Sequence, residues 1–322
     1  MKERVLVSIV NWVNEDLTIE CIESVLRHCA LEQDSISIVD NSADVIALKK
    51  IPQLFPSINI IRTSSNLGFA AGHYESVKYA KTKGFQFIWL LNNDCFLSND
   101  ALEPLLKSIK ADKNIIAGSI IANYQDSTIQ YADGYQIDLN RKIRLNKHAT
   151  SNSLKGRNIA ELHSQPDWIR TSHVSGSSMF FSIDLVNENG FMDFSFFLYY
   201  EETDWCFRLW NEKGIKSYVI KESVVYHKES SSFFNEGLKA VKNYYVNRNA
   251  YFFSKRYFDD HRKISLALVF ELLLKIIKLK IASSRKRRYF KSSEYLNDLS
   301  LLHSYFGIKG KTFNPNELIS NI

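Results

Sequence analysis

Carboxylate and amide side chains follow two apolar runs near the N-terminus, at the points where those runs end. Asn11 and Trp12 follow the first run, and Asp40 opens an Asp-Asn-Ser sequence after the second. Two such clusters at neighbouring strand ends can line a nucleotide pocket, in which Asp40 accepts from a base N–H and the indole ring supports the base. Asp-Asn-Ser is also typical of a turn closed by its own side chain, and taken alone the motif favours the turn.

A further carboxylate, Asp94, ends the run Trp-Leu-Leu-Asn-Asn-Asp at 89–94. Asp94 is well placed there to bind Mg²⁺ or Mn²⁺, because these ions prefer oxygen ligands and share them with a substrate diphosphate. An ordinary turn explains Asn92, Asn93 and Asp94 almost as well. His227 ends the short run Val-Val-Tyr-His, and a lone histidine is more often structural than a ligand.

Three acids, Glu201, Glu202 and Asp204, follow an aromatic run at 196–200 that could form the wall of a sugar pocket. Acids in the first turn of a helix also complement its dipole, so a structural role explains them too. Glu202 and Asp204 project about 200° apart around a helix and need not share a role. Asp204 and Arg208, four residues apart, are predicted to form an ion pair.

The sequence Asn66-Leu67-Gly68-Phe69 precedes a helical pattern and offers small residues at the helix start. Backbone N–H groups there could approach an anion such as a diphosphate. A glycine that allows close packing of two segments explains Gly68 equally well. The glycine fingerprints of dinucleotide-binding domains and of P-loops are absent after the first strand.

Strands and helices alternate through the first 120 residues, which predicts an α/β fold with a mainly parallel sheet covered on both faces. The predicted strands are Val5–Val10, Ser35–Val39, Ile58–Arg62, Phe85–Leu91 and Ile115–Ile121, with helices at Leu17–Leu26, Ala70–Lys81 and Ala101–Ala111. Ligands of such sheets bind beyond the carboxyl ends of the strands. The candidate residues above therefore belong to one edge of the sheet.

The second half of the chain has mixed topology and then becomes helical. A strand is predicted near Ser177–Ser182 and a helix from about Glu202; helices alone follow at Leu238–Tyr257, Ile264–Ile281 and Glu294–Phe306. We expect a catalytic domain at 1–230, with a nucleotide-binding half at 1–121 and an acceptor and catalytic half at 122–230. A helical region at 231–322 follows, with the boundary in the 230–237 loop.

The composition is that of a globular protein of 322 residues, with 45% hydrophobic and 24% charged residues. Its four scattered cysteines predict reduced, buried thiols rather than disulfides or a zinc site. The N-terminal apolar run is too short for a signal peptide, and the apolar stretch 265–282 contains too many charges to span a membrane. We therefore expect a cytoplasmic protein.

The positive charge gathers near the C-terminus, whereas the formal net charge of the whole chain is only +6. Eight basic residues lie between 275 and 291 without an intervening acid, which predicts contact with an anionic membrane surface. A solvated helix face that packs on the catalytic domain or on a second subunit is the alternative. No nucleic-acid partner is expected, and an oligomer is compatible with the sequence.

In order along the chain, the motifs resemble glycosyltransferase family 2, the inverting GT-A enzymes, and in particular their rhamnosyltransferase-like bacterial members. The resemblance covers about residues 4–260 and rests on the set IVNW, IVDNS, NLGFAAG, WLLNND, SGSSMFF, FLYYEETDWCFR, VVYH and YYVNRN. It implies the GT-A type of Rossmann-like fold, a nucleotide-diphosphate sugar donor and one divalent metal ion, Mn²⁺ or Mg²⁺.

The resemblance also implies roles for individual residues. Asp40 would recognise a uracil or thymine base, Asn92 would contact ribose or phosphate, and Asp94 with His227 would hold the metal. The catalytic pair of the family corresponds to Glu201 and Glu202, with Glu202 as the base.

Four positions depart from the pattern of the family. Val13 and His73 stand where many relatives have asparagine, and Asn92 replaces the first aspartate of a strict DxD motif. Glu202 replaces the usual aspartate base, so its side chain is longer by one methylene and Asp204 remains a second candidate.

Together these features predict an inverting, metal-dependent hexosyltransferase of bacterial surface polysaccharide synthesis. The donor would be dTDP-rhamnose or, second, a UDP-sugar, and the acceptor a hydroxyl of a glycan or lipid-linked glycan. Two alternatives are a metal-dependent nucleotidyltransferase and a non-catalytic basic module that binds membrane or RNA. The first should carry a glycine-rich, lysine-containing loop after the first strand, and the second would not explain acids and a histidine at strand ends.

Overall fold

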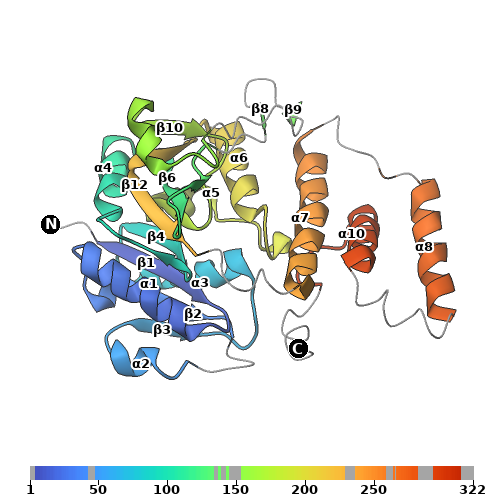
Figure 1. The fold of residues 1–322 in the computed structure, drawn as a ribbon, viewed down its shortest axis with the longest axis horizontal. Coiled ribbons are helices and arrows are strands. Elements are labelled where there is room, and N and C mark those ends of the chain that lie inside the picture. The colour runs from blue at the N-terminus through green and yellow to red at the C-terminus, as the bar shows by residue number, and fades with distance from the viewer. Residues whose placement is uncertain are drawn as a thin grey trace.

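The computed structural model describes residues 4–42, 48–133, 137–138, 143–144, 154–228, 236–258, 264, 266–281 and 293–312. Its centre is a single sheet with the strand order β10-β12-β6-β11-β4-β1-β2-β3 (Figure 1). The strands are β1 Val5–Asn11, β2 Ile36–Asp40, β3 Asn59–Arg62, β4 Phe87–Asn92, β6 Ile115–Asn123, β10 Trp168–Thr171, β11 Ser178–Ser182 and β12 Lys216–His227. The short strands β5 Cys95–Phe96 and β7 Ile129–Tyr131 pair with β12 and β6. The predicted α/β fold is thereby confirmed.

The first half of the sheet is parallel, as the alternation of strands and helices predicts. β1 pairs in parallel with β2 and with β4, and β2 pairs in parallel with β3. The register places Asn11 beside Asp40 and Val10 beside Asn92, so the polar residues that end these strands lie at one edge.

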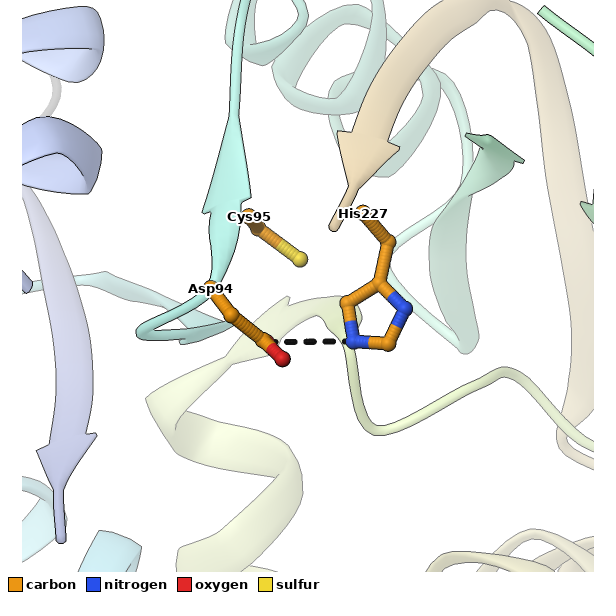
Figure 2. A group of neighbouring side chains, drawn as sticks. All are labelled: Asp94, Cys95 and His227. Atoms are coloured by element: carbon orange, nitrogen blue, oxygen red, sulfur yellow. Dashed lines mark ion pairs between the residues drawn. The ribbon is translucent and has the colours of Figure 1, made fainter. Parts of the chain in front are cut away.

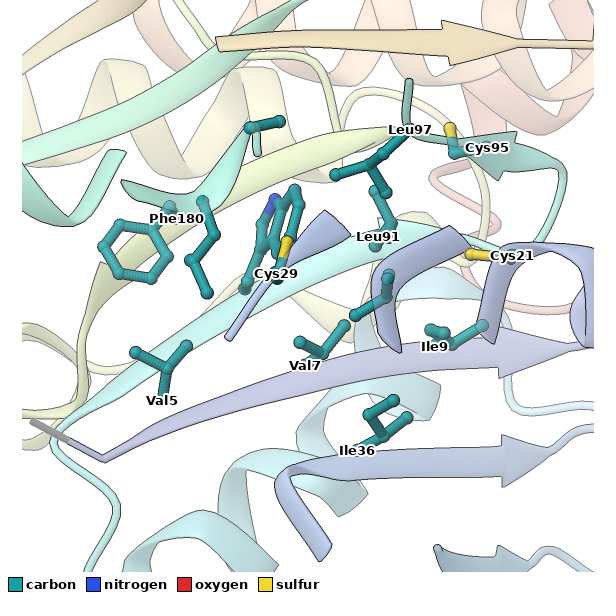
Figure 3. Packing of buried hydrophobic residues seen from close by; sticks show 14 of the residues in the cluster. Val5, Val7, Ile9, Cys21, Cys29, Ile36, Leu91, Cys95, Leu97 and Phe180 are labelled. Carbon is teal, nitrogen blue, oxygen red and sulfur yellow. The ribbon is translucent and has the colours of Figure 1, made fainter. Parts of the chain in front are cut away.

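Helices cover both faces of the sheet, which explains why its central strands are almost continuously apolar. On one face lie α1 Glu15–His28, beside β1, and α4 Leu102–Ala111, beside β6 and β12. Val5, Val7 and Ile9 of β1 and Cys21 of α1 belong to the buried apolar cluster of this face (Figure 3). On the other face lie α3 Phe69–Lys83, α5 Ile183–Asn189 and α6 Glu201–Lys213. A short helix, α2 Ile51–Leu54, precedes β3.

The second half mixes strand directions. β11 lies antiparallel between β4 and β6, whereas β12 runs parallel to β6 with a register shift between Ile220 and Val224. The ribbon of β8 Ile137–Asp138 and β9 Ile143–Arg144 lies apart from the main sheet. Among the described residues, the 3-10 turns η2 Ile159–Ser164 and η3 Phe194–Phe196 lie in this half, and η1 Gln33–Ser35 lies between α1 and β2 in the first half.

The C-terminal helices are α7 Glu236–Tyr257, α8 Leu266–Ile281 and α10 Ser293–Phe306, close to their predicted bounds. Aromatic side chains of α7, among them Phe252 and Phe253, pack with Phe196 and Phe207 of the catalytic half. α10 lies between α7 and α8, and α8 is farthest from the sheet (Figure 1). The predicted boundary at 230–237 and much of the 275–291 basic run lie outside the described residues.

All four cysteines are buried and free, as predicted. Within the described part of the chain, no helix combines the length and the apolar character of a membrane span.

Candidate functional site

The ends of β1 and β2 form a buried polar cluster around Asp40. Its Oδ1 accepts from the Ser42 hydroxyl at 2.6 Å and from the Ser42 amide at 3.2 Å, and the Asn11 amide nitrogen lies 3.5 Å away. The other carboxylate oxygen, Oδ2, is buried and has no hydrogen-bond partner among the described residues. Half of this carboxylate is thus fixed by the turn, whereas the other half is buried, and Asp40 does not line the cavity beyond the strand ends.

Trp12 and Val13 follow β1 in a tight turn. Val13 has φ 67°, and the Asn14 amide donates to the Trp12 carbonyl at 2.9 Å, which is the pattern of a γ-turn. Asn14 then caps α1 by accepting from the Leu17 amide at 3.2 Å. The turn leaves Trp12 in the lining of a cavity of about 450 Å³.

Gly68 allows two segments to approach closely. It has φ 83°, and a Cβ at this position would overlap the carbonyl oxygen of Phe197. That same carbonyl accepts from the Phe69 amide at 3.0 Å, and the Asn66 side chain accepts from the Gly68 amide at 2.8 Å. The first amide of α3 is therefore engaged within the protein, which favours close packing over anion binding as the role of Gly68.

Asp94 and His227 face one another at the end of the sheet, with the Cys95 thiol beside them (Figure 2). The His227 Nε2 lies 3.1 Å from the Asp94 Oδ1, and the antiparallel pairing of β12 with β5 sets His227 opposite Cys95. Both side chains are partly exposed, at 14% for His227 and 11% for Asp94. The structure thus brings together two residues that are 133 positions apart in the sequence.

Gln130 on β7 fixes the orientation of the His227 ring. The His227 Nδ1 lies 3.0 Å from the Gln130 Oε1, and the Gln130 amide donates to the His227 carbonyl at 3.2 Å. A Nδ1–H that donates to Gln130 leaves Nε2 with its lone pair toward Asp94, as a metal ligand requires. The sequence pattern gave no indication of Gln130.

These groups fit a divalent cation with an oxygen and nitrogen donor set. One carboxylate and one imidazole would leave several positions for the diphosphate oxygens of a ligand. Burial, followed by the nearby Asp94 charge, raises the pKa of Cys95 well above its usual value. A thiol is in addition a soft ligand, whereas Mg²⁺ and Mn²⁺ prefer oxygen, so Cys95 is a poor ligand for these ions.

Asn92 and Asn93 point in different directions. The Asn92 side chain lines the cavity and donates to the Ser177 hydroxyl at 3.2 Å. The Asn93 side chain donates to Thr18 of α1 at 3.1 Å and does not line the cavity.

Glu201 and Glu202 begin α6 and both line the cavity. Glu201 is 2% exposed, and burial together with the charge of Glu202 raises its pKa well above the usual value. Glu202 is partly exposed to the cavity, yet the surrounding protein removes enough water to raise its pKa to about 7. Carboxyls with raised pKa values in a cleft are candidates for proton transfer.

Asp204 lies on another side of α6, as the 200° separation predicts. It is fully buried and pairs with Arg256 of α7 at 2.7 Å, and Arg256 also pairs with Asp193. The predicted pairing of Asp204 with Arg208 is wrong, because Arg208 donates to the Asn189 and Phe191 carbonyls. Asp204 is not among the residues that line the cavity.

The cavity gathers residues from distant parts of the chain, including several to which the sequence assigned no individual role. Ser175, Gly176 and Ser177 precede β11, and Lys242 belongs to α7. A neighbouring cavity of about 470 Å³ shares Ser175, Ser177 and His227 with the first. Nothing in the sequence marks Lys242, because its helix has ordinary spacing and its place depends on how α7 packs.

Comparisons with known proteins agree with this arrangement. The family model described as glycosyl transferase family 2 matches residues 5–183, more than half of the chain. A search of the curated proteins found no match.

Two solved structures share the fold. One is a mannosyltransferase, PcManGT from Pyrobaculum calidifontis, in complex with GDP-Man and Mn²⁺, with 10% identity and a TM-score of 0.56; the match covers 95% of this chain and 88% of that one. The other is GalNAc-T7 with UDP, GalNAc and Mn²⁺, with 15% identity and a TM-score of 0.55. That match covers 95% of this chain but only 58% of GalNAc-T7. At these identities the likeness establishes the GT-A type of fold.

Proposed function

Since the chain belongs to glycosyl transferase family 2, we propose that it transfers a sugar, with inversion, from a nucleotide-diphosphate donor to an acceptor hydroxyl. The observation that carries the proposal is the cavity of about 450 Å³, which Asp94, His227 and Glu202 line together. A metal-binding pair and a carboxyl with a raised pKa are the two groups that such a displacement needs.

The first half of the chain would bind the donor. Asp40 would accept from a uracil or thymine N–H at its buried Oδ2, although it does not line the cavity as Trp12 and Asn92 do. Asp94 and His227 would hold Mn²⁺ or Mg²⁺. When bound, the ion would neutralise charge on the leaving diphosphate.

Glu202 would remove the proton from the acceptor hydroxyl. Ionised Glu202 accepts the proton of the acceptor hydroxyl as that oxygen attacks the anomeric carbon from the side opposite the leaving group. Burial and the adjacent Glu202 charge raise the pKa of Glu201 well above its usual value, which favours its protonated form. Asp204 forms a buried ion pair with Arg256, and we therefore assign it a structural role.

We propose dTDP-rhamnose as the first candidate donor and UDP-sugars as the second, with a glycan or lipid-linked glycan of a bacterial surface polysaccharide as acceptor. The 122–230 half would bind the acceptor, since its residues line the adjoining cavity. A nucleotidyltransferase is disfavoured because the residues after β1 form a γ-turn and a helix cap instead of a glycine-rich loop.

A thermal-shift screen tests the proposal directly. Donor binding stabilises the native state by mass action, by about 2.7 kcal/mol at a hundredfold excess over Kd. We expect one of a set of dTDP- and UDP-sugars to raise the Tm in the presence of Mn²⁺ and less so in EDTA. Equal Tm values with all donors and with none would contradict the proposed function.

The face of α8 that points away from α10 supports a membrane contact from the cytoplasmic side. Large apolar side chains on this face are exposed, among them Leu266 at 73%, Phe270 at 64% and Ile277 at 51%. The basic residues at 285–291 follow directly in the sequence. An apolar stripe beside positive charge is typical of a helix that lies on an anionic bilayer.

Vesicle sedimentation tests this contact. We expect binding to vesicles with anionic lipid, weaker binding to neutral vesicles, and loss of binding in Phe270→Glu. Leu54→Glu, which changes an apolar residue of α2 that is 55% exposed, is the matched control. Binding that is equal on both vesicle types, or dimer formation that Phe270→Glu abolishes while vesicle binding persists, would contradict the membrane contact.

A further inference from the structure

Two polar side chains of α7, Arg248 and Asn249, are completely buried beneath the turn that leads into Glu201 and Glu202. Burial of an amide and a guanidinium is unfavourable unless their hydrogen bonds are satisfied. The partners of both side chains therefore indicate what the pair does.

The turn in question, Phe196–Tyr200, has a strained backbone. Phe197, Tyr199 and Tyr200 have φ of 67°, 65° and 76°, in the region that residues other than glycine rarely adopt. Phe197, with ψ −59°, forms a γ-turn closed by the Leu198 amide and the Phe196 carbonyl at 2.9 Å. Such a backbone conformation is unfavourable and persists only where its surroundings hold it.

Asn249 provides several of the hydrogen bonds that stabilise this turn. Its amide nitrogen lies 2.9 Å from the Phe196 carbonyl, 2.8 Å from the Leu198 carbonyl and 2.9 Å from the Tyr199 carbonyl. One side chain thus gathers three carbonyl oxygens of a five-residue turn. The remaining carbonyl before Tyr200, that of Phe197, accepts from the Phe69 amide of α3.

Arg248 fixes which way the Asn249 amide points. Its Nε donates to the Asn249 Oδ1 at 3.0 Å, so the NH₂ group of Asn249 must face the turn. Its other nitrogens donate to the Phe196 carbonyl at 3.0 Å and to the Gly310 carbonyl and Thr312 hydroxyl at 2.9 and 2.6 Å. The helical region and the segment after α10 are therefore tied to the turn.

We propose that Asn249, oriented by Arg248, is a positioning residue that holds the 196–200 turn in its strained form, so that Glu202 is directed into the cavity. The catalytic consequence rests on the proposed function of Glu202 as base. A purely structural role would lower stability without altering the surroundings of Glu202.

The experiment compares the full-length protein with Asn249→Ser, which removes the amide, and with Asn249→Asp, which keeps the shape and the acceptor for Arg248 but removes the donor. Asn247→Ser is the matched control, because Asn247 lies on the same helix, is exposed and donates only to Asn297 at 3.4 Å among its described contacts. Both readouts are free of ligand: hydrogen exchange of the 196–204 amides, and the pKa of Glu202 from ¹³C NMR of glutamate-labelled protein, assigned with Glu202→Gln.

Loss of the Asn249 amide should speed exchange in the turn by about tenfold or more, as expected for local opening. It should also lower the Glu202 pKa from about 7 toward its usual value of 4.5, because water reaches the relaxed carboxyl. The charged and titratable groups that share the cavity with Glu202, namely Glu201, Asp94, His227 and Lys242, are unchanged in every variant.

Unchanged exchange in both folded Asn249 variants would overturn the proposal, as would faster exchange with an unaltered Glu202 pKa. The same changes in Asn247→Ser would also overturn it. If the protein transfers no sugar, the proposed function fails, whereas exchange and titration still decide whether Asn249 orders the turn.

Discussion

Replacement of Glu202 by glutamine should have opposite effects on activity and on stability. The substitution keeps the shape of the side chain and removes only its capacity to ionise. General-base catalysis typically contributes about 10²–10⁴-fold to a rate, so transfer should fall by that factor while donor affinity stays within about threefold. In the wild-type protein, transfer should decline as the pH falls below about 7, where Glu202 takes up a proton.

The stability effect follows from the raised pKa. The pKa of Glu202 is about 7 in the folded protein against a usual value of 4.5, and each unit corresponds to about 1.4 kcal/mol. Because the folded state holds this proton more tightly, the contribution of Glu202 to stability is greatest below pH 4.5 and declines as the pH rises through 7. Glu202→Gln should therefore be more stable than wild type at pH 8, by at most about 3 kcal/mol, and similar at pH 4.5.

Stability is measured by urea unfolding at pH 4.5 and pH 8. Donor affinity is measured by calorimetric titration, and the transfer rate by product release. Glu188→Gln, at an exposed position of α5, is the control and should change none of them. Transfer by Glu202→Gln at the wild-type rate would remove Glu202 from the mechanism. A stability difference that is the same at pH 4.5 and pH 8 would refute the assignment of its raised pKa.

Three further predictions concern metal binding, packing and the buried ion pair. Asp94→Ala should weaken Mn²⁺ binding, measured by EPR, by at least about 100-fold, more than loss of an outer hydrogen-bond partner would; wild-type affinity would contradict the metal site. Gly68→Ala should lower the free energy of unfolding by about 3 kcal/mol more than Gly190→Ala, since both glycines have positive φ but only Gly68 meets a carbonyl oxygen. Arg256→Met should destabilise by about 3 kcal/mol at pH 8, by urea unfolding, and less at pH 5, where the uncompensated Asp204 carboxylate can take up a proton.

Much of the fold could be predicted from the sequence because its determinants are local. Apolar runs and helical spacing predicted β1, β2, β3, β4 and β6 to within a few residues, and likewise α1, α3 and α4, but not the short helix α2. The order of polar residues at strand ends also predicted that Asp94 lies at the same edge as Trp12 and Asn92, since parallel strands end at one edge of the sheet, and all three line one cavity.

The contacts that the sequence did not reveal join residues far apart in the chain. Arg256 pairs with Asp204 across 52 positions, although the helical spacing favoured Arg208. Gln130 orients His227 across 97 positions, and Gly68 lies against Phe197 because two loops meet. Local patterns carry no information on such pairs, which depend on how α7 and β7 pack on the sheet.

Release of nucleoside diphosphate from a panel of dTDP- and UDP-sugars, with Mn²⁺ and acceptor glycans, tests the central claim most directly. We expect the wild-type protein to release dTDP or UDP from one donor, EDTA and Asp94→Ala to stop release, and Glu202→Gln to slow it by about 10²–10⁴-fold. No release from any donor, or equal release by wild type and both variants, would contradict a sugar transferase that uses Asp94 and Glu202.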